Sequence, residues 1–144
     1  SALGRLAYTC GERGDYPKEA ELEEKLYALR CKVLGAEHEK TLVTMNNLAY
    51  SYFETGEVQK AWELYKKAYA VSEKAFGKEY KSTQTALAGL AVTCEKLGNY
   101  TEALKYFEEL HRLRADILGT DHEETEKVSR KIGEIKEIIQ KNAE

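Results

Sequence analysis

The sequences LGAEHEKT (residues 34–41), FGKEYKST (76–83) and LGTDHEET (118–125) decide the fold of this chain. Each follows a helix-like segment, and their glycines Gly35, Gly77 and Gly119 lie 42 residues apart. A period of this size is typical of repeat architectures, in which a unit buries its apolar face only against its neighbours. The sequence therefore predicts an array, with function on the surface that the stack creates.

A second series of glycines, Gly14, Gly56 and Gly98, has the same spacing of 42 residues and divides each unit into two segments. Glycine followed within a few residues by a new amphipathic run indicates that one helix ends and another begins. Apolar residues recur at helical spacing in both segments of each unit. In the first segments they are Leu3, Leu6, Ala7 and Cys10, then Met45, Leu48, Ala49 and Tyr52, then Leu87, Leu90, Ala91 and Cys94. We expect an all-α chain built from antiparallel helix pairs.

The period divides the chain into a single array. Repeat 1 is expected at about 1–37, repeat 2 at about 38–79 and repeat 3 at about 80–121, followed by a helix at about 122–143. In that last helix Ser129 and Lys136 stand where earlier repeats have large residues. This pattern favours a capping helix, with the first helix of a further repeat as the alternative.

Composition narrows the classes of partner. The 144 residues include 22 basic and 25 acidic side chains, so no global field draws the chain to nucleic acid or an anionic membrane. No apolar run approaches the roughly 18 residues of a membrane span. Three cysteines, with Cys10 and Cys94 two periods apart, favour a reducing compartment and core thiols. We expect a cytoplasmic protein, and the apolar spacing that begins at Leu3 suggests a piece of a longer chain.

The middle unit reads Met45-x2-Leu48-Ala49-x2-Tyr52, then Gly56, then Ala61-x3-Tyr65, and Ala103-x3-Phe107 repeats its second half. This resembles the tetratricopeptide pattern, lengthened by about eight residues per repeat. The length and the exit sequence LGAEHEKT before TMNNLA are similar to the tetratricopeptide repeats of kinesin light chains. The resemblance implies a right-handed superhelix whose first helices line a concave groove for extended peptides or partner proteins.

Helical geometry then places candidate binding residues. If Met45, Leu48 and Tyr52 face the core, a separate stripe runs along the same helix, and its period equivalents continue it on the other first helices. The stripe comprises Arg5, Tyr8 and Glu12, then Val43, Asn47, Tyr50 and Glu54, then Thr85, Gly89, Val92 and Lys96, then Lys127, Lys131 and Glu134. The resemblance implies that this stripe lines the groove, and the candidate groove residues are Arg5, Tyr8, Asn47, Tyr50, Val92, Lys96, Lys127 and Lys131.

Each candidate group has a second interpretation. Tyr8 and Tyr50 occupy equivalent positions of two repeats. They either contact apolar side chains of a ligand or pack between neighbouring repeats. Lys96, Lys127, Arg130 and Lys131 favour a ligand with an acidic stretch, although a solvated helix face explains these charges equally well.

Catalysis, a cofactor and a metal are not expected. His38 and His122 occupy equivalent exit loops two periods apart, too distant to share a ligand, and are interpreted as loop-packing residues. The sequence has no phosphate-binding loop, nucleophile elbow or paired-cysteine zinc spacing. Two functions remain open. The first is a non-catalytic module that binds a peptide or partner protein in the groove, and the second is a structural spacer or self-association segment.

Overall fold

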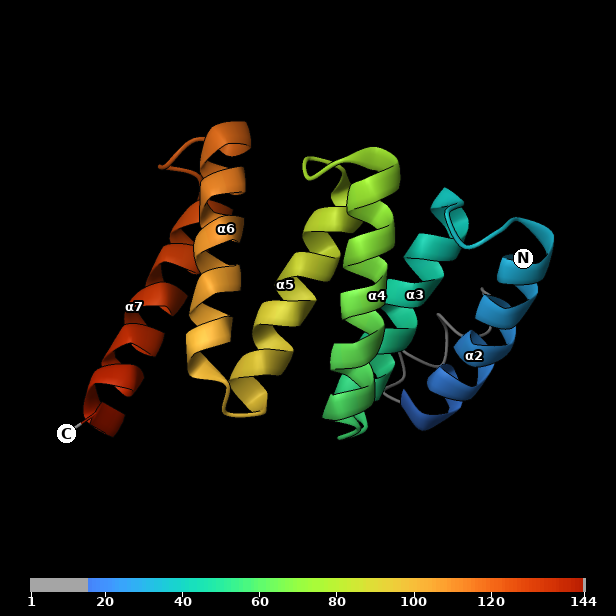
Figure 1. Cartoon of the computed structure of the whole chain (residues 1–144), viewed down its shortest axis with the longest axis horizontal. Helices are drawn as coiled ribbons and strands as arrows, with labels where there is room; N and C mark the ends of the chain where they lie inside the picture. The colour runs from blue at the N-terminus through green and yellow to red at the C-terminus, as the bar shows by residue number, and fades with distance from the viewer. Residues whose placement is uncertain (1–15, 144) are drawn as a thin grey trace.

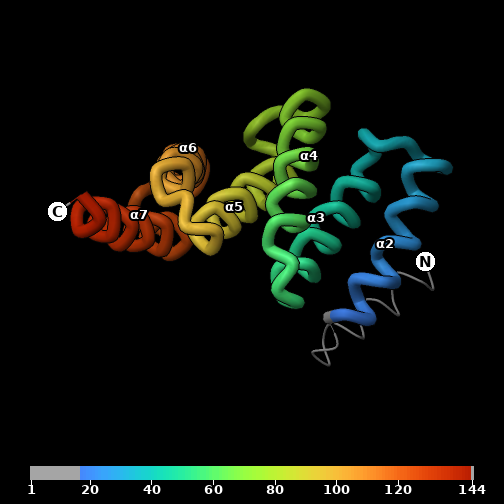
Figure 2. The backbone as a smooth tube through the Cα atoms, turned by 60° about the horizontal axis from the view of Figure 1, so that its bottom comes forward, coloured from blue at the N-terminus to red at the C-terminus, as the bar shows by residue number. Residues whose placement is uncertain are grey.

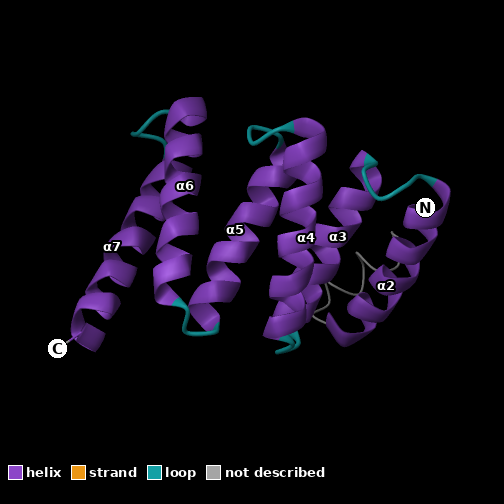
Figure 3. Ribbon diagram, viewed as in Figure 1, coloured by secondary structure: helices purple, strands orange, loops and turns teal. Residues whose placement is uncertain are grey.

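The computed structural model describes residues 16–143, and every regular element in that range is an α-helix (Figure 3). The helices are α2 (Tyr16–Val33), α3 (Glu39–Glu54), α4 (Val58–Phe76), α5 (Lys81–Lys96), α6 (Tyr100–Leu118) and α7 (Glu123–Ala143). The prediction of an all-α chain is confirmed. The expected first helix of repeat 1, with Arg5, Tyr8, Cys10 and Gly14, lies outside the described residues.

Each helix packs against the next one in the chain, and α3 also packs against α5 (Figure 1). We call α3, α5 and α7 the first helices and α2, α4 and α6 the second helices. Figure 2 shows the helices following one another along the array, so that α2 and α7 lie at opposite ends. α3 and α5 are therefore neighbours in space although α4 separates them in the sequence.

The glycine series ends the helices, as the period predicts. Gly77 and Gly119 follow α4 and α6 with φ of 89° and 91°, a left-handed conformation that residues with a Cβ rarely adopt. Each glycine amide still donates to the helix that it closes, Gly77 to the Glu73 carbonyl and Gly119 to the Ala115 carbonyl, both at 2.9 Å. A shared backbone requirement thus explains why glycine recurs with the period.

Among the described residues, the core contains two clusters of buried residues, and the partly buried side chains of Trp62, Tyr69 and Tyr106 pack against both. Met45 and Ala49 of α3 and Leu87 and Ala91 of α5 have no exposed surface, as their common spacing predicts. Cys94 is equally buried, which raises the pKa of its thiol, first through desolvation. Burial confirms Cys94 as a core thiol.

His38 and His122 act differently from the expectation that they pack in their loops. Both side chains are exposed, and each Nδ1 accepts a hydrogen bond of 3.1 Å from a backbone N–H in the first turn of the following helix. The donors are the amides of Lys40 in α3 and Glu124 in α7. These histidines therefore cap helix N-termini, because a first-turn N–H has no partner within its own helix.

Tyr65 of α4 joins two first helices. Its ring is buried beside Gly89 of α5, where an added Cβ would lie 2.4 Å from the ring carbons. Such a distance is far below van der Waals contact, so the ring occupies the space that a side chain at residue 89 would need. The period places Phe107 at the equivalent position of α6, and it is buried as well.

We predict that Gly89→Ala destabilises the fold by about 1–2 kcal/mol, because the clash with Tyr65 outweighs the better helix propensity of alanine. Gly133→Ala is the matched control, since Gly133 also lies within a helix but has nothing within 4 Å of an added Cβ. We expect the control to stabilise the protein by roughly 0.5–1 kcal/mol. Urea unfolding of both variants measures the difference, and equal stability of the two would contradict the packing role of Gly89.

Glu19 and Glu23 of α2 stand where α4 carries Ala61 and Tyr65. Glu23 is only 4% exposed and one of its carboxylate oxygens has no hydrogen-bond partner. Desolvation, followed by the nearby charge of Glu19, raises the pKa of Glu23 to about 7 against the lowering effect of Arg30. The first repeat thus carries a buried acid at a position where later repeats carry an aromatic ring.

This acid makes stability depend on pH. Between the ordinary pKa of 4.5 and about 7, folded Glu23 stays protonated while the unfolded chain ionises. Unfolding then releases a proton, so stability falls as pH rises through this window and is constant above it. Glu23→Gln should weaken the dependence, leaving the part that comes from the raised pKa of Glu19, and should raise stability at pH 8 by about 2 kcal/mol. Glu21→Gln, at an exposed residue paired with Lys25, is the control. A Glu23→Gln protein with an unchanged pH profile in thermal unfolding would refute the assignment.

Candidate binding groove

Three hollows lie along the surface where α3 meets α5. The first, the polar hollow, has a volume of about 390 Å³ and is bounded by the N-terminal halves of both helices. It is lined by Glu39, Val43, Asn46, Asn47, Tyr80, Lys81, Ser82 and Thr85. Asn46 is buried and its Nδ2 donates to the Ser82 carbonyl at 3.1 Å, which ties the wall of α3 to the start of α5. Asn47, next in the chain, is exposed on the same hollow.

The second, the apolar hollow, has a volume of about 250 Å³ and shares Thr85 with the first. Its other lining residues are Tyr50, Phe53, Tyr65, Ala88, Gly89 and Val92. Tyr50 is 47% exposed and Val92 is 39% exposed, so two apolar side chains on facing helices remain open to a ligand. Tyr65 forms part of the wall because Gly89 leaves room for its ring.

The third, the charged hollow, has a volume of about 300 Å³ and shares Phe53 and Val92 with the second. Glu95, Lys96, Tyr100 and Ile138 complete its lining, so α6 and α7 contribute here. Because each hollow shares residues with the next, the three form one groove, which we call the first-helix groove.

An ion pair limits the positive charge at this end of the groove. Lys131 of α7 lies 2.6 Å from a carboxylate oxygen of Glu95 and 3.7 Å from Glu134. The hydrogen bond to Glu95 is the main reason that the pKa of Lys131 is raised. Lys96 is exposed and forms no ion pair with any residue in the range 16–143. Among the charged groups that line the hollow, Lys96 is therefore the cation open to a ligand.

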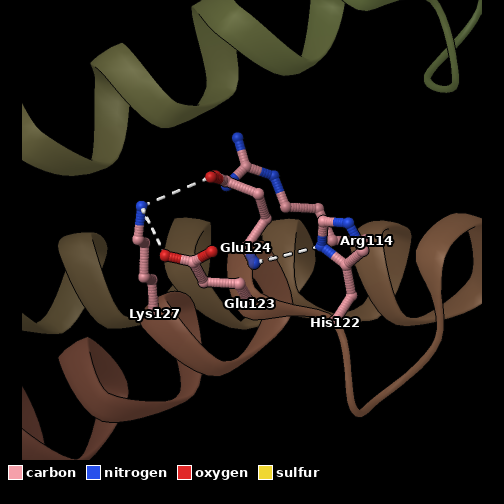
Figure 4. Close-up of polar contacts among 5 residues, drawn as sticks. All are labelled: Arg114, His122, Glu123, Glu124 and Lys127. Carbon is pink, nitrogen blue, oxygen red and sulfur yellow. Dashed lines mark hydrogen bonds and ion pairs between the residues drawn. The ribbon is translucent and has the colours of Figure 1, made fainter.

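Lys127 lies among acids at the start of α7 (Figure 4). Its Nζ is 3.7 Å from Glu123 and 3.4 Å from Glu124, and Arg114 of α6 also reaches Glu124 at 3.3 Å. Acids in the first turn of a helix interact favourably with its N-terminal dipole. Lys127 thus belongs to a network that holds α6 to α7, and it lines none of the three hollows.

The structure places the candidate residues as follows. Asn47, Tyr50, Val92 and Lys96 line one groove, while Lys131 contacts it through Glu95. Arg5 and Tyr8 lie outside the described residues. The sequence reasoning missed Phe53, Tyr100 and Ile138, because these side chains come from helix ends that meet only in the folded array.

Within residues 16–143, no group of three histidine, cysteine, aspartate or glutamate side chains is arranged to hold a metal ion. In the same range, none of the helices combines the length and the apolar character that a membrane crossing requires.

A family model of the tetratricopeptide repeat matches residues 1–74 and 82–144. The chain belongs to the tetratricopeptide repeat family. Repeats of this family generally bind protein partners and serve as non-enzymatic scaffolds, and the all-α array described above is a tetratricopeptide solenoid.

Solved structures of kinesin-light-chain type are similar to this array. Two crystal structures of Podosopora anserina TPR-like repeats described as kinesin light chain, one of them a point variant, superpose with a TM-score of 0.84 at 25% identity. The alignments cover 93% of this chain, which spans 63% and 64% of those two chains. BtubC (BKLC) from P. vanneervenii has a TM-score of 0.79 at 22% identity, covering 92% of this chain and 52% of that one, and shows the shared fold. No curated protein matches the sequence.

Proposed function

We propose that this tetratricopeptide array is a non-catalytic binding module that holds an extended peptide segment of a partner protein in the first-helix groove. The observation that carries the proposal is the continuity of three hollows along α3, α5 and α7. Four of the candidate groove residues, Asn47, Tyr50, Val92 and Lys96, line this groove from its polar to its charged end.

The groove is polar at one end, apolar in the middle and charged at the other end. This order favours a peptide that binds in one orientation along the groove. The apolar hollow suits an apolar side chain, because Tyr50 and Val92 lose exposed surface when it is filled. The exposed amide of Asn47 supplies both donors and an acceptor for a peptide backbone. An acidic residue of the ligand pairs best with Lys96, since Lys131 is already held by Glu95.

The test begins with peptides selected from a random library on the immobilised protein. We predict that Val92→Asp weakens their binding about tenfold or more, because its carboxylate places a charge in the apolar hollow and, one helical turn before Lys96, competes with an acidic residue of the ligand for that lysine. Tyr50→Ala should act in the same direction. Affinities measured by isothermal titration calorimetry give the comparison.

Ile117→Asp is the matched control, because Ile117 is 46% exposed on α6 and lies outside the groove. It places the same charge on a comparable aliphatic site and should leave peptide binding unchanged. Selected peptides that bind the Val92→Asp and Tyr50→Ala proteins as tightly as the wild type would overturn the groove proposal.

Self-association of the array is the second candidate function, and the end of α2 favours it. Leu29 is 52% exposed, whereas Leu113, two periods later, is 7% exposed in α6. The same position is thus covered in a later repeat and open in the first. One helical turn after Leu29, Val33 is 69% exposed, and its equivalent Ile117 is 46% exposed. A second copy that packs on this edge would bury Leu29 and Val33.

For this second candidate, light scattering should show a molar mass that rises with protein concentration. Leu29→Glu combined with Val33→Glu should keep the protein monomeric, because charged residues oppose burial of the edge. Ala28→Glu adds charge at an exposed neighbouring residue and is the control. A wild-type protein that stays monomeric at every concentration would exclude self-association.

A further inference from the structure

A fourth hollow lies on the other side of α3, among the second helices. It has a volume of about 360 Å³ and is lined by residues of α2, α3 and α4. Leu48 and Leu64 provide apolar surface, and Tyr27 and Tyr52 provide two aromatic walls. Glu24, Lys60, Glu63 and Lys67 complete the lining. We call it the second-helix hollow.

The next repeat junction shows what fits such a space. Tyr106 of α6 stands one period after Leu64, and its ring is partly buried and packs against both clusters of buried core residues, as Trp62 and Tyr69 do. Tyr69 is itself the period equivalent of Tyr27. A tyrosine ring of the chain thus occupies, between α4 and α6, the position that the smaller Leu64 leaves open between α2 and α4.

The charges around the two equivalent positions have opposite signs. Every charged residue that lines the second-helix hollow is replaced one period later by a residue of opposite charge. The pairs are Glu24 and Lys66, Lys60 and Glu102, Glu63 and Lys105, and Lys67 and Glu109. A ligand in the second-helix hollow is therefore surrounded by charges opposite in sign to those at the period-equivalent residues around Tyr106.

The surroundings of the Tyr106 ring indicate which charges its polar edge meets. Burial raises the pKa of Tyr106, and neighbouring Cys94, Glu102 and Glu109 raise it further. The period equivalents of the two glutamates are Lys60 and Lys67. A ring bound in the same orientation would direct its far edge toward two lysines, which favour a negatively charged substituent.

Two lysines lie beside the tyrosine rings of the hollow. The Nζ of Lys60 lies 5.5 Å from the centre of the Tyr52 ring, and that of Lys67 lies 5.9 Å from the centre of the Tyr27 ring. Lys60 also forms an exposed ion pair of 3.2 Å with Glu57, and exposed pairs of this kind contribute little in water. Glu63 accepts a hydrogen bond of 3.5 Å from Gln59. Glu24 accepts a hydrogen bond from the Tyr52 hydroxyl. Lys67 forms no ion pair with any described residue, so its charge is available to an anion.

We propose that the second-helix hollow binds an aromatic side chain of a partner polypeptide that carries an anionic group on its ring, the chemistry that a phosphotyrosine provides. The ring lies between Tyr27 and Tyr52, and the anion pairs with Lys60 and Lys67. This site is separate from the first-helix groove, so either proposal can fail without the other.

The test compares a short phosphotyrosine peptide with the same peptide unphosphorylated, titrated into the protein and followed by calorimetry and by NMR of the tyrosine rings. The phosphorylated peptide should bind about tenfold more tightly and shift the Tyr27 and Tyr52 signals. Equal binding of the two peptides, or no binding of either, would overturn the proposal.

Two variants introduce the residues that stand one period later in the sequence. One tests the space in the hollow and the other tests its charge. Leu64→Tyr should fill the hollow and abolish binding while the thermal midpoint is retained or raised. Lys60→Glu combined with Lys67→Glu leaves the hollow open but should remove the preference for phosphate. Lys74→Glu, at an exposed residue of α4 outside the hollow, is the control and should bind as the wild type does. Unchanged phosphopeptide binding by either variant would contradict the assigned site.

Discussion

The whole structure depends on one constraint, which is that no helix pair of this chain buries its own apolar residues. α3 packs against α2, α4 and α5, and only together do these neighbours cover residues such as Leu42 and Met45 completely. A free helix hairpin would leave these side chains in water, at a cost of roughly 1.5–3 kcal/mol for each large one. Stacking is therefore the condition for folding, and the surfaces between repeats follow from it.

The contact between Tyr65 and Gly89 shows how the same constraint forms a binding surface. The aromatic side chain of a second helix fills the gap between two first helices, and glycine on α5 leaves room for it. Because α5 carries no side chain at this point, Tyr50 and Val92 line an open hollow above the packed ring. Core packing and the shape of the first-helix groove thus rest on the same two residues.

Differences between repeats carry the specific properties of the array. Glu23 occupies the place of an aromatic residue and makes the first repeat sensitive to pH. Leu64 occupies the place of Tyr106 and leaves a hollow with lysines at its rim. In both cases the backbone of the repeat is the same and one side chain differs. The fold therefore sets the position of the site, and the individual side chain sets its chemical properties.

By itself, the sequence determined the positions of the helices, because glycine at Gly77 and Gly119 is needed for a backbone conformation that other residues avoid. Helical periodicity also placed Asn47, Tyr50, Val92 and Lys96 on one stripe, and these residues line one groove. Only the tertiary structure decided that Glu95 of α5 pairs with Lys131 of α7, that Arg114 of α6 reaches Glu124 of α7, and that Phe53 and Ile138 line one hollow. Periodicity fixes the face of a helix on which a residue lies, whereas its partners are set by the packing angle and separation of helices far apart in the sequence.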